Sequence, residues 1–282
     1  MKSVVLVSEV IDLSCNLVVE GVDAELWNKC IFKKANYCDL IALEIITRLE
    51  KDSDNYIETV TVGQDKAIQL IKSHIAPKVN KSTLIVEQDI AKCDSYYVSN
   101  IIGSYLTKSC IDIILCGDKT SDYGGGITGS LLASNLGYNY IGNIIDIISL
   151  DNKNKTICVK RKMDWGKREI LVVPLPIVLG IDEGEITPSM PTFEQKLDVT
   201  VELIDANTLA SHIKKKQKNF NVGVHILKPR GVFSPDETLS PAERIKALMS
   251  GGLNKKRSDI WEGGEESLSD QLVDYLKEIQ VL

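Results

Sequence analysis

Four short apolar segments in the first half of the chain alternate with longer segments of helical spacing. The four segments are rich in β-branched residues, which is typical of strands buried on both faces of a sheet. They cover residues 4–7, 56–62, 82–87 and 111–117. Strands that alternate with helices form parallel sheets with right-handed crossovers. The sequence therefore predicts an α/β fold, a parallel sheet with helices on both faces.

Three helices are expected between these strands. Residues 40–49, 65–74 and 95–106 carry apolar residues at helical spacing. Asn36 or Asp39 precedes the apolar run of the first helix and is of a residue type that caps helix starts. On the simplest interpretation, either side chain serves only as that cap.

More strands are expected between the first strand and the first helix and also after this alternating region. The apolar segments at residues 17–19 and 30–32 suggest a hairpin-like excursion before the first helix. Pro174 and Pro176 bound two later apolar runs and suit strand ends or edges. The later strands are expected over residues 143–148, 155–160, 168–174, 176–180 and 199–204.

A glycine-rich loop connects the fourth strand to another helix. The strand ends at Gly117, three consecutive glycines occupy positions 124–126, and helical spacing resumes at residues 131–136. Glycine allows close backbone approach, and the first amides of a helix have no intrahelical acceptor, so such a loop can bind a phosphate. No Gly-Lys-Ser/Thr follows, which excludes a P-loop, and a glycine-rich surface turn is the alternative.

The position of this loop in the predicted fold favours ligand binding. Ligands of parallel α/β sheets bind at the carboxyl ends of the strands, near a switch in strand order. Ser8, Gly63 and the loop from Gly117 follow three of the expected strands. We therefore expect them to line one crevice.

The composition is that of an ordinary globular protein and argues against a nucleic-acid-binding, secreted or membrane protein. The chain has 282 residues, is 44% hydrophobic and has a formal net charge of −6, which argues against a nucleic-acid-coating surface. The lysine-rich run at residues 214–218 is interpreted as a solvated face. Its seven cysteines form no C-x-x-C pair, which favours a reducing, cytoplasmic location. We expect neither a signal peptide nor a membrane span.

Two short helices are expected in the C-terminal tail. The sequence Ser240-Pro241-Ala242-Glu243 is a capping box with proline at the first helical position, and Gly251-Gly252 is expected to end that helix. Ser267 is expected to precede a last amphipathic helix that reaches about residue 279. Because this tail has little apolar content, either packing on a partner or a loosely held appendage would explain it.

A set of short motifs occurs in a defined order along nearly the whole chain. They are Val5-x-Val7-x-x-Val10-Ile11-Asp12, Asn36-x-x-Asp39-x-x-Ala42-Leu43-Glu44, Gly117, Asp122, Thr128-Gly129, Asp164-x-Gly166 and Leu175-Pro176. Gly263 and the helix through residues 275–277 follow near the end. In order and spacing, these features resemble the β subunit of electron transfer flavoproteins.

The resemblance implies an electron carrier subunit rather than a stand-alone enzyme. The fold would be adenine-nucleotide hydrolase-like, and the partner an electron transfer flavoprotein α-like subunit carrying a redox-active FAD. The β-like subunit would hold AMP or, in bifurcating members, a second FAD. The heterodimer would pass electrons between a flavin dehydrogenase, such as an acyl-CoA dehydrogenase, and an acceptor. Residues 1–185 would form the nucleotide-binding domain, and residues 186–282 a partner-docking segment and an extended C-terminal arm.

The family's functional positions can be carried over residue by residue. Phe193 falls where the family has its partner-docking leucine, although a core or arm-packing aromatic is the alternative. The implied nucleotide site comprises Leu6, Asn36, Tyr37, Cys38, Asp39, Val62, Gly117, Asp122, Gly124, Gly125, Gly126, Ile127, Thr128 and Gly129.

The sequence also departs from the family pattern. Ser8 replaces a lysine and Tyr37 a proline, while Gly126 and Ile127 replace an asparagine and a glutamine. The missing lysine removes a cation that would favour phosphate, and a three-glycine backbone nest would offset part of that loss. The family's Asn-x-Pro-Arg stretch survives only as Pro188, between Ile186 and Ser189, and its later lysine-rich run is reduced to Lys196.

Neither a catalytic nor a metal-binding residue is predicted. An electron carrier needs no acid–base set, since the flavin performs the redox chemistry. His74, His212 and His225 lie far apart in the sequence, without metal-ligand spacing. Two alternatives remain, an ATP-hydrolysing enzyme of the related fold and an AMP-binding module that transfers no electrons. The C-terminal arm and the family order beyond the glycine loop favour the electron carrier.

Overall fold

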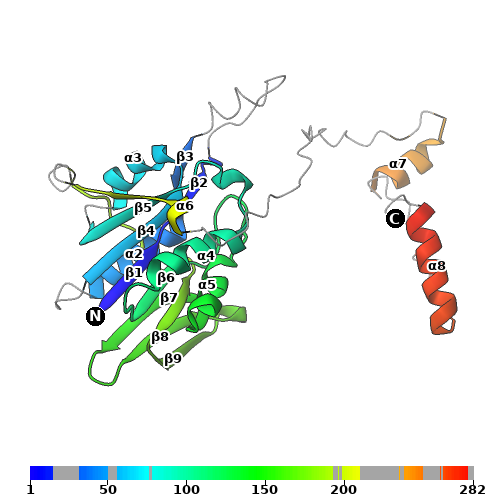
Figure 1. Cartoon of the computed structure of the whole chain (residues 1–282). Coiled ribbons are helices and arrows are strands. Elements are labelled where there is room, and N and C mark those ends of the chain that lie inside the picture. The colour runs from blue at the N-terminus through cyan, green and yellow to red at the C-terminus, as the bar shows by residue number, and fades with distance from the viewer. Residues whose placement is uncertain are drawn as a thin grey trace. The chain divides into compact units, whose positions relative to one another are not determined.

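A computed structural model describes most of the chain, in two compact units. The described residues are 1–14, 32–49, 56–75, 78–192, 196, 199–209, 235, 238–249, 261 and 263–278. The first unit is Met1–Phe220 and the second is Asn221–Leu282 (Figure 1). The boundary predicted after residue 185 divides the chain by function, into a nucleotide-binding domain and a partner-docking segment with its arm. It stays a prediction.

A nine-stranded sheet forms the framework of the described part of the first unit, in the order β11-β5-β4-β1-β6-β10-β7-β8-β9. The strands from β11 to β7 are parallel, and the last two strands extend the sheet in antiparallel fashion. Their bounds are β1 (Lys2–Leu6), β4 (Tyr56–Gly63), β5 (Lys81–Val86), β6 (Ile113–Gly117), β7 (Asn139–Asp151), β8 (Thr156–Lys162), β9 (Arg168–Pro174), β10 (Ile177–Ile181) and β11 (Glu202–Asp205).

Helices cover both faces of this sheet, as predicted. Helix α2 (Tyr37–Leu49) packs on one face, whereas α4 (Ser95–Leu106) and α5 (Thr128–Leu136) pack on the other (Figure 1). The short helix α6 (Ala206–Leu209) follows β11 and contributes to the core on the α4 side.

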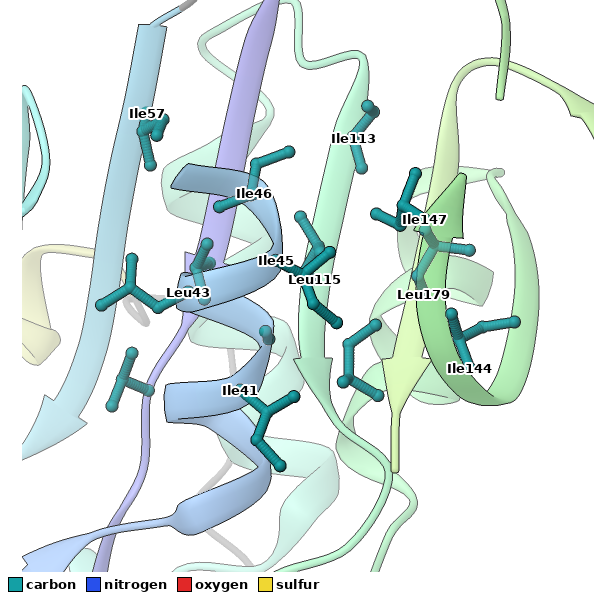
Figure 2. Packing of buried hydrophobic residues seen from close by; sticks show 14 of the residues in the cluster. Ile41, Leu43, Ile45, Ile46, Ile57, Ile113, Leu115, Ile144, Ile147 and Leu179 are labelled. Carbon is teal, nitrogen blue, oxygen red and sulfur yellow. The ribbon is translucent and has the colours of Figure 1, made fainter. Parts of the chain in front are cut away.

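Buried aliphatic side chains hold these layers together. Figure 2 shows Ile41, Ile45 and Ile46 of α2 gathered with Ile113 and Leu115 of β6, and all five are at most 2% exposed. Burying each side chain of this size contributes roughly 1.5–3 kcal/mol to folding. These buried side chains of α2 and β6 therefore contribute substantially to the stability of the fold.

Some elements differ from the sequence-based prediction. Strand β7 begins four residues earlier than expected, at Asn139. The predicted helix over residues 65–74 is a succession of a 3-10 turn (Asp65–Ala67), α3 (Ile68–Leu70) and a π-helical turn (Ile71–Ile75).

The hairpin-like excursion was predicted on residues that lie mostly outside the described ranges. Among the described residues, β2 (Glu9–Ile11) pairs antiparallel with β3 (Lys33–Ala35). A hairpin pairing is thus present, but on strands that flank the predicted ones. Strand β3 was not predicted because it contains two lysines and therefore forms no apolar run.

The second unit contains α7 (Pro241–Met249) and α8 (Glu265–Glu278). One half of the predicted capping box is confirmed, because the Ser240 amide donates to the Glu243 carboxylate at 3.0 Å. The Ser240 hydroxyl donates to the same carboxylate at 2.6 Å. Helix α8 begins two residues before Ser267, which corrects the predicted start, and Gly251-Gly252 lies outside the described residues. The helices of the described residues are all too short or too polar to cross a membrane.

Strand order creates a switch point beside β1. The chain places β4 and then β5 on one side of β1, and then crosses over to place β6 on the other side. In a parallel sheet the connections at such a point diverge, which leaves a crevice at the carboxyl ends of the strands.

Candidate functional site

A cavity of about 80 Å³ lies at this switch point. Its walls come from the carboxyl ends of β1, β4 and β6, from α4 and from the loop that leads to α5. Seven of the predicted site residues line it, namely Leu6, Asp39, Val62, Gly117, Gly126, Thr128 and Gly129. Ser8 also lines the cavity as expected, whereas Gly63 does not and its neighbour Val62 takes that place.

Asp39 joins the ends of the two central strands. Its carboxylate accepts hydrogen bonds from the Ser8 amide after β1, at 2.8 Å, and from the Gly117 amide at the end of β6, at 2.5 Å. Burial raises the pKa of Asp39 to about 6, and these two amides limit the rise. The carboxyl is therefore mostly ionised at neutral pH.

Asn36 fixes the loop that follows β6. Its side-chain amide donates to the Lys119 carbonyl oxygen at 3.0 Å, and its side-chain oxygen accepts from the Ser121 amide at 3.2 Å. The interpretation of Asn36 or Asp39 as only a helix cap is thus incomplete, because both side chains reach from the start of α2 and the residue before it to other strand ends and loops.

Gly117 is required by this close packing. A Cβ at this position would lie 2.5 Å from the Asp39 Oδ1 atom and 2.7 Å from the Asn36 Nδ2 atom. Only glycine, which has no Cβ, lets the start of α2 approach the end of β6 this closely.

The glycine-rich loop ends beside the cavity, where α5 begins. Gly124 and Gly126 have φ angles of 63° and 60°, in the left-handed region that favours glycine. Within the described residues, no side chain caps α5 at Ile127, so Thr128 begins the helix and is not its cap. Thr128 and Gly129 both line the cavity, so the first amides of α5 and the positive end of its dipole lie beside it.

The other predicted residues surround the site without lining the cavity. Tyr37 and Ile127 are exposed, and a Cβ at Gly125 would meet no described atom within 4 Å. Asp122 accepts from the Ile11 amide at 3.4 Å and so holds the loop near β2. Cys38 is buried, and burial together with the charge of Asp39 raises the pKa of its thiol to about 12. Phe193 lies outside the described residues.

Several lining residues were missed by the sequence interpretation. Val98 and Ile102 come from α4, and only the packing of that helix against the sheet brings them to the cavity. Cys116 lies just before Gly117, and burial raises the pKa of its thiol. Lys119 and Thr120 belong to the glycine-rich loop itself, where a basic residue two positions after the strand was the available signal.

A charged cluster borders the cavity on the side of β10. The Asp182 carboxylate, 5% exposed, receives Lys162 Nζ at 2.8 Å and Lys119 Nζ at 3.4 Å. The Glu183 amide donates to the same carboxylate at 2.8 Å. In the described part of the chain, no three His, Cys, Asp or Glu side chains come together in a way that could hold a metal ion.

Comparison with known proteins identifies the family. Residues 33–209, which include α2, the glycine loop and most of the sheet, match the electron transfer flavoprotein domain. The chain belongs to the electron transfer flavoprotein family.

Two relatives of this chain are named as β subunits of electron transfer flavoproteins. The chain is 26% identical to the electron transfer flavoprotein subunit beta of Bacillus subtilis over 222 residues, which are 76% of this chain and 84% of that protein. It is 23% identical to the subunit beta of Methylophilus methylotrophus over 151 residues, 53% of this chain. That second match spans 57% of the relative's length. We therefore describe this electron transfer flavoprotein as β-like.

The residues at the cavity fit part of an adenine nucleotide. The uncapped start of α5 and Lys119 suit a phosphate group, and the apolar wall of Val60, Val62 and Val98 suits a base. The enclosed volume of about 80 Å³ is smaller than common ligand pockets of roughly 300–1,000 Å³. A whole nucleotide would therefore extend beyond the enclosed part of the crevice.

Proposed function

We propose that this chain is the β-like subunit of a heterodimeric electron transfer flavoprotein. Its partner is an α-like subunit that carries the redox-active FAD. The β-like subunit holds AMP in the crevice at the ends of β1 and β6 or, if the complex is of the bifurcating type, a second FAD. The observation that carries this proposal is the uncapped start of α5 and its glycine loop beside the switch-point cavity, in a chain related to β subunits.

The chain's own residues have a binding and orienting role. When bound, the flavin supplies the electron-transfer chemistry. Asp39 holds the ends of β1 and β6 together, and Asn36 holds the loop that follows β6. The amides at the start of α5 bind phosphate, and the apolar wall from β4 and α4 contacts the base. No proton transfer by the protein is required in this role.

The complex acts between a dehydrogenase and an electron acceptor in the cytoplasm. A flavin dehydrogenase such as an acyl-CoA dehydrogenase is the proposed donor. Phe193, in the segment that follows residues 186–192, is the proposed docking side chain for the partner.

Size-exclusion chromatography with the co-expressed α-like subunit tests the pairing. We expect a yellow 1:1 complex, because an isolated chain without redox flavin is colourless or weakly coloured. Phe193→Asp should weaken the complex by about 1–3 kcal/mol, as expected for a buried aromatic anchor. The matched control is Phe32→Asp, since Phe32 is 67% exposed and no docking role is proposed for it.

Three results would contradict the proposal. A chain that remains monomeric beside the α-like subunit would exclude the heterodimer. ATP hydrolysis by the isolated chain would favour a stand-alone enzyme, while tight AMP binding by a chain that forms no complex with the α-like subunit would favour a nucleotide-sensing module.

A further inference from the structure

Lys119 is the only basic residue among the described residues that line the cavity. It lies in the loop between β6 and α5, two residues after Gly117, and its carbonyl is fixed by the Asn36 side chain. The side chain itself is 55% exposed. Its backbone is therefore held at the cavity, while its exposed side chain can reorient if the ion pair with Asp182 opens.

Apart from Lys162, which pairs with Asp182, the charged side chains described around Lys119 are carboxylates. Asp39 lines it, and Asp182 and Glu183 lie close enough to Lys119 to raise the pKa of its ammonium group, Asp182 most strongly. Asp118 precedes Lys119 in the loop, and its carboxylate accepts from the Tyr140 hydroxyl and the Asn143 amide. A phosphate that enters this region meets repulsion unless a cation offsets it.

Asp182 can release Lys119 without losing all of its own partners. Lys119 Nζ lies 3.4 Å from Asp182, whereas Lys162 Nζ lies at 2.8 Å. The Glu183 amide remains as a further donor. A buried carboxylate left alone is strongly destabilising, but one that keeps a cation and an amide is not.

We propose that Lys119 is the phosphate-binding cation of this site and is held by Asp182 until a nucleotide arrives. This inference rests on the proposed nucleotide-binding function. The ammonium group leaves Asp182, contacts a phosphate oxygen and acts together with the first amides of α5. The site thereby distinguishes a nucleotide from its nucleoside.

Calorimetric titration of the full-length chain, alone and in complex with its partner subunit, tests this role. The probes are AMP and adenosine, which share the base and ribose but differ in the phosphate. Lys119→Gln should weaken AMP binding by about tenfold or more and leave adenosine binding unchanged, since a charge-assisted contact is lost only with AMP. Lys119→Arg keeps the cation and should restore most of the AMP affinity.

The matched control is Lys167→Gln, which makes the same charge change at an exposed residue outside the cavity lining. It should leave the affinity for both probes unchanged. Equal weakening of AMP and adenosine by Lys119→Gln would show a structural role and overturn the inference, as would an unchanged AMP affinity. If the wild-type chain binds neither probe in either form, the proposed nucleotide site itself is wrong and the inference falls with it.

Discussion

Replacing Gly117 with alanine is expected to destabilise the first unit by about 3 kcal/mol and to abolish nucleotide retention. The added Cβ would lie 2.5 Å from Asp39 Oδ1, 2.7 Å from Asn36 Nδ2 and 3.0 Å from Cys38 Cβ. Overpacking of a tight site costs about 1–3 kcal/mol, and weakening a hydrogen bond to a buried carboxylate adds about 1–3 kcal/mol. Urea unfolding and the nucleotide content of the purified protein measure the two effects.

Gly125→Ala is the matched control for this substitution. A Cβ at Gly125 would meet no described atom within 4 Å, so its effect on unfolding should stay within about 0.5 kcal/mol. If Gly117→Ala is as stable as this control, the close approach of α2 to the end of β6 does not hold the site together.

Glu44→Gln is expected to lower the free energy of unfolding by about 3 kcal/mol near neutral pH. The Glu44 carboxylate accepts from the Ser189 hydroxyl at 2.7 Å, from Lys78 Nζ at 3.1 Å and from Arg48 Nε at 3.0 Å. Its side chain is 9% exposed and that of Lys78 is 11% exposed. Removing the charge leaves a largely buried ammonium group without its carboxylate, which is costly.

The effect of Glu44→Gln should depend on pH in a defined direction. Burial alone would raise the pKa of Glu44, but hydrogen bonds from Ser189, Lys78 and Arg48 outweigh it and lower the pKa from 4.5 to about 2. A carboxyl with a lowered pKa in the folded state stabilises above its unfolded pKa, and this contribution is lost as the pH falls through the folded value. The loss in free energy of unfolding relative to wild type should therefore be largest above a pH of about 5 and shrink as the pH falls toward about 2.

Unfolding in urea across this range measures the difference. Arg48→Gln is the control at the same site, because Arg48 is 50% exposed and its loss should cost less than about 1 kcal/mol. A Glu44→Gln difference that stays constant between neutral and acidic pH would contradict the assigned charge interactions. Glu44 also holds Ser189 in the segment that precedes the proposed docking residue, so the variant should weaken partner binding as well.

Local sequence patterns were sufficient to predict most of the sheet and its helices. The β-branched runs that became β1, β4, β5 and β6 are buried on both faces, so they form uninterrupted apolar segments. Helix α4 has the bounds predicted from its apolar spacing, and the structure shows that Asp94 caps it by accepting from the Tyr97 amide at 2.7 Å. Strand β3 has no such pattern, because two of its three residues are exposed lysines.

The site was harder to predict than the fold because its contacts join distant residues. The Asp39 carboxylate meets the Gly117 amide across 78 positions in the sequence, and no local pattern distinguishes this role from a helix cap. Val98 and Ile102 look like ordinary core residues of an amphipathic helix until the sheet is assembled. The glycines were predictable, because positive φ angles and close packing restrict those positions to one residue type.

The most direct test of the account is the nucleotide content of the complex purified with its co-expressed α-like subunit. Acid release followed by chromatography should yield one FAD and one further adenine nucleotide per heterodimer. If the further nucleotide is AMP, the complex is a simple carrier, and if it is a second FAD, the complex is of the bifurcating type. A complex that releases no second nucleotide, or a chain that hydrolyses ATP and carries no flavoprotein partner, would contradict the proposed site and function.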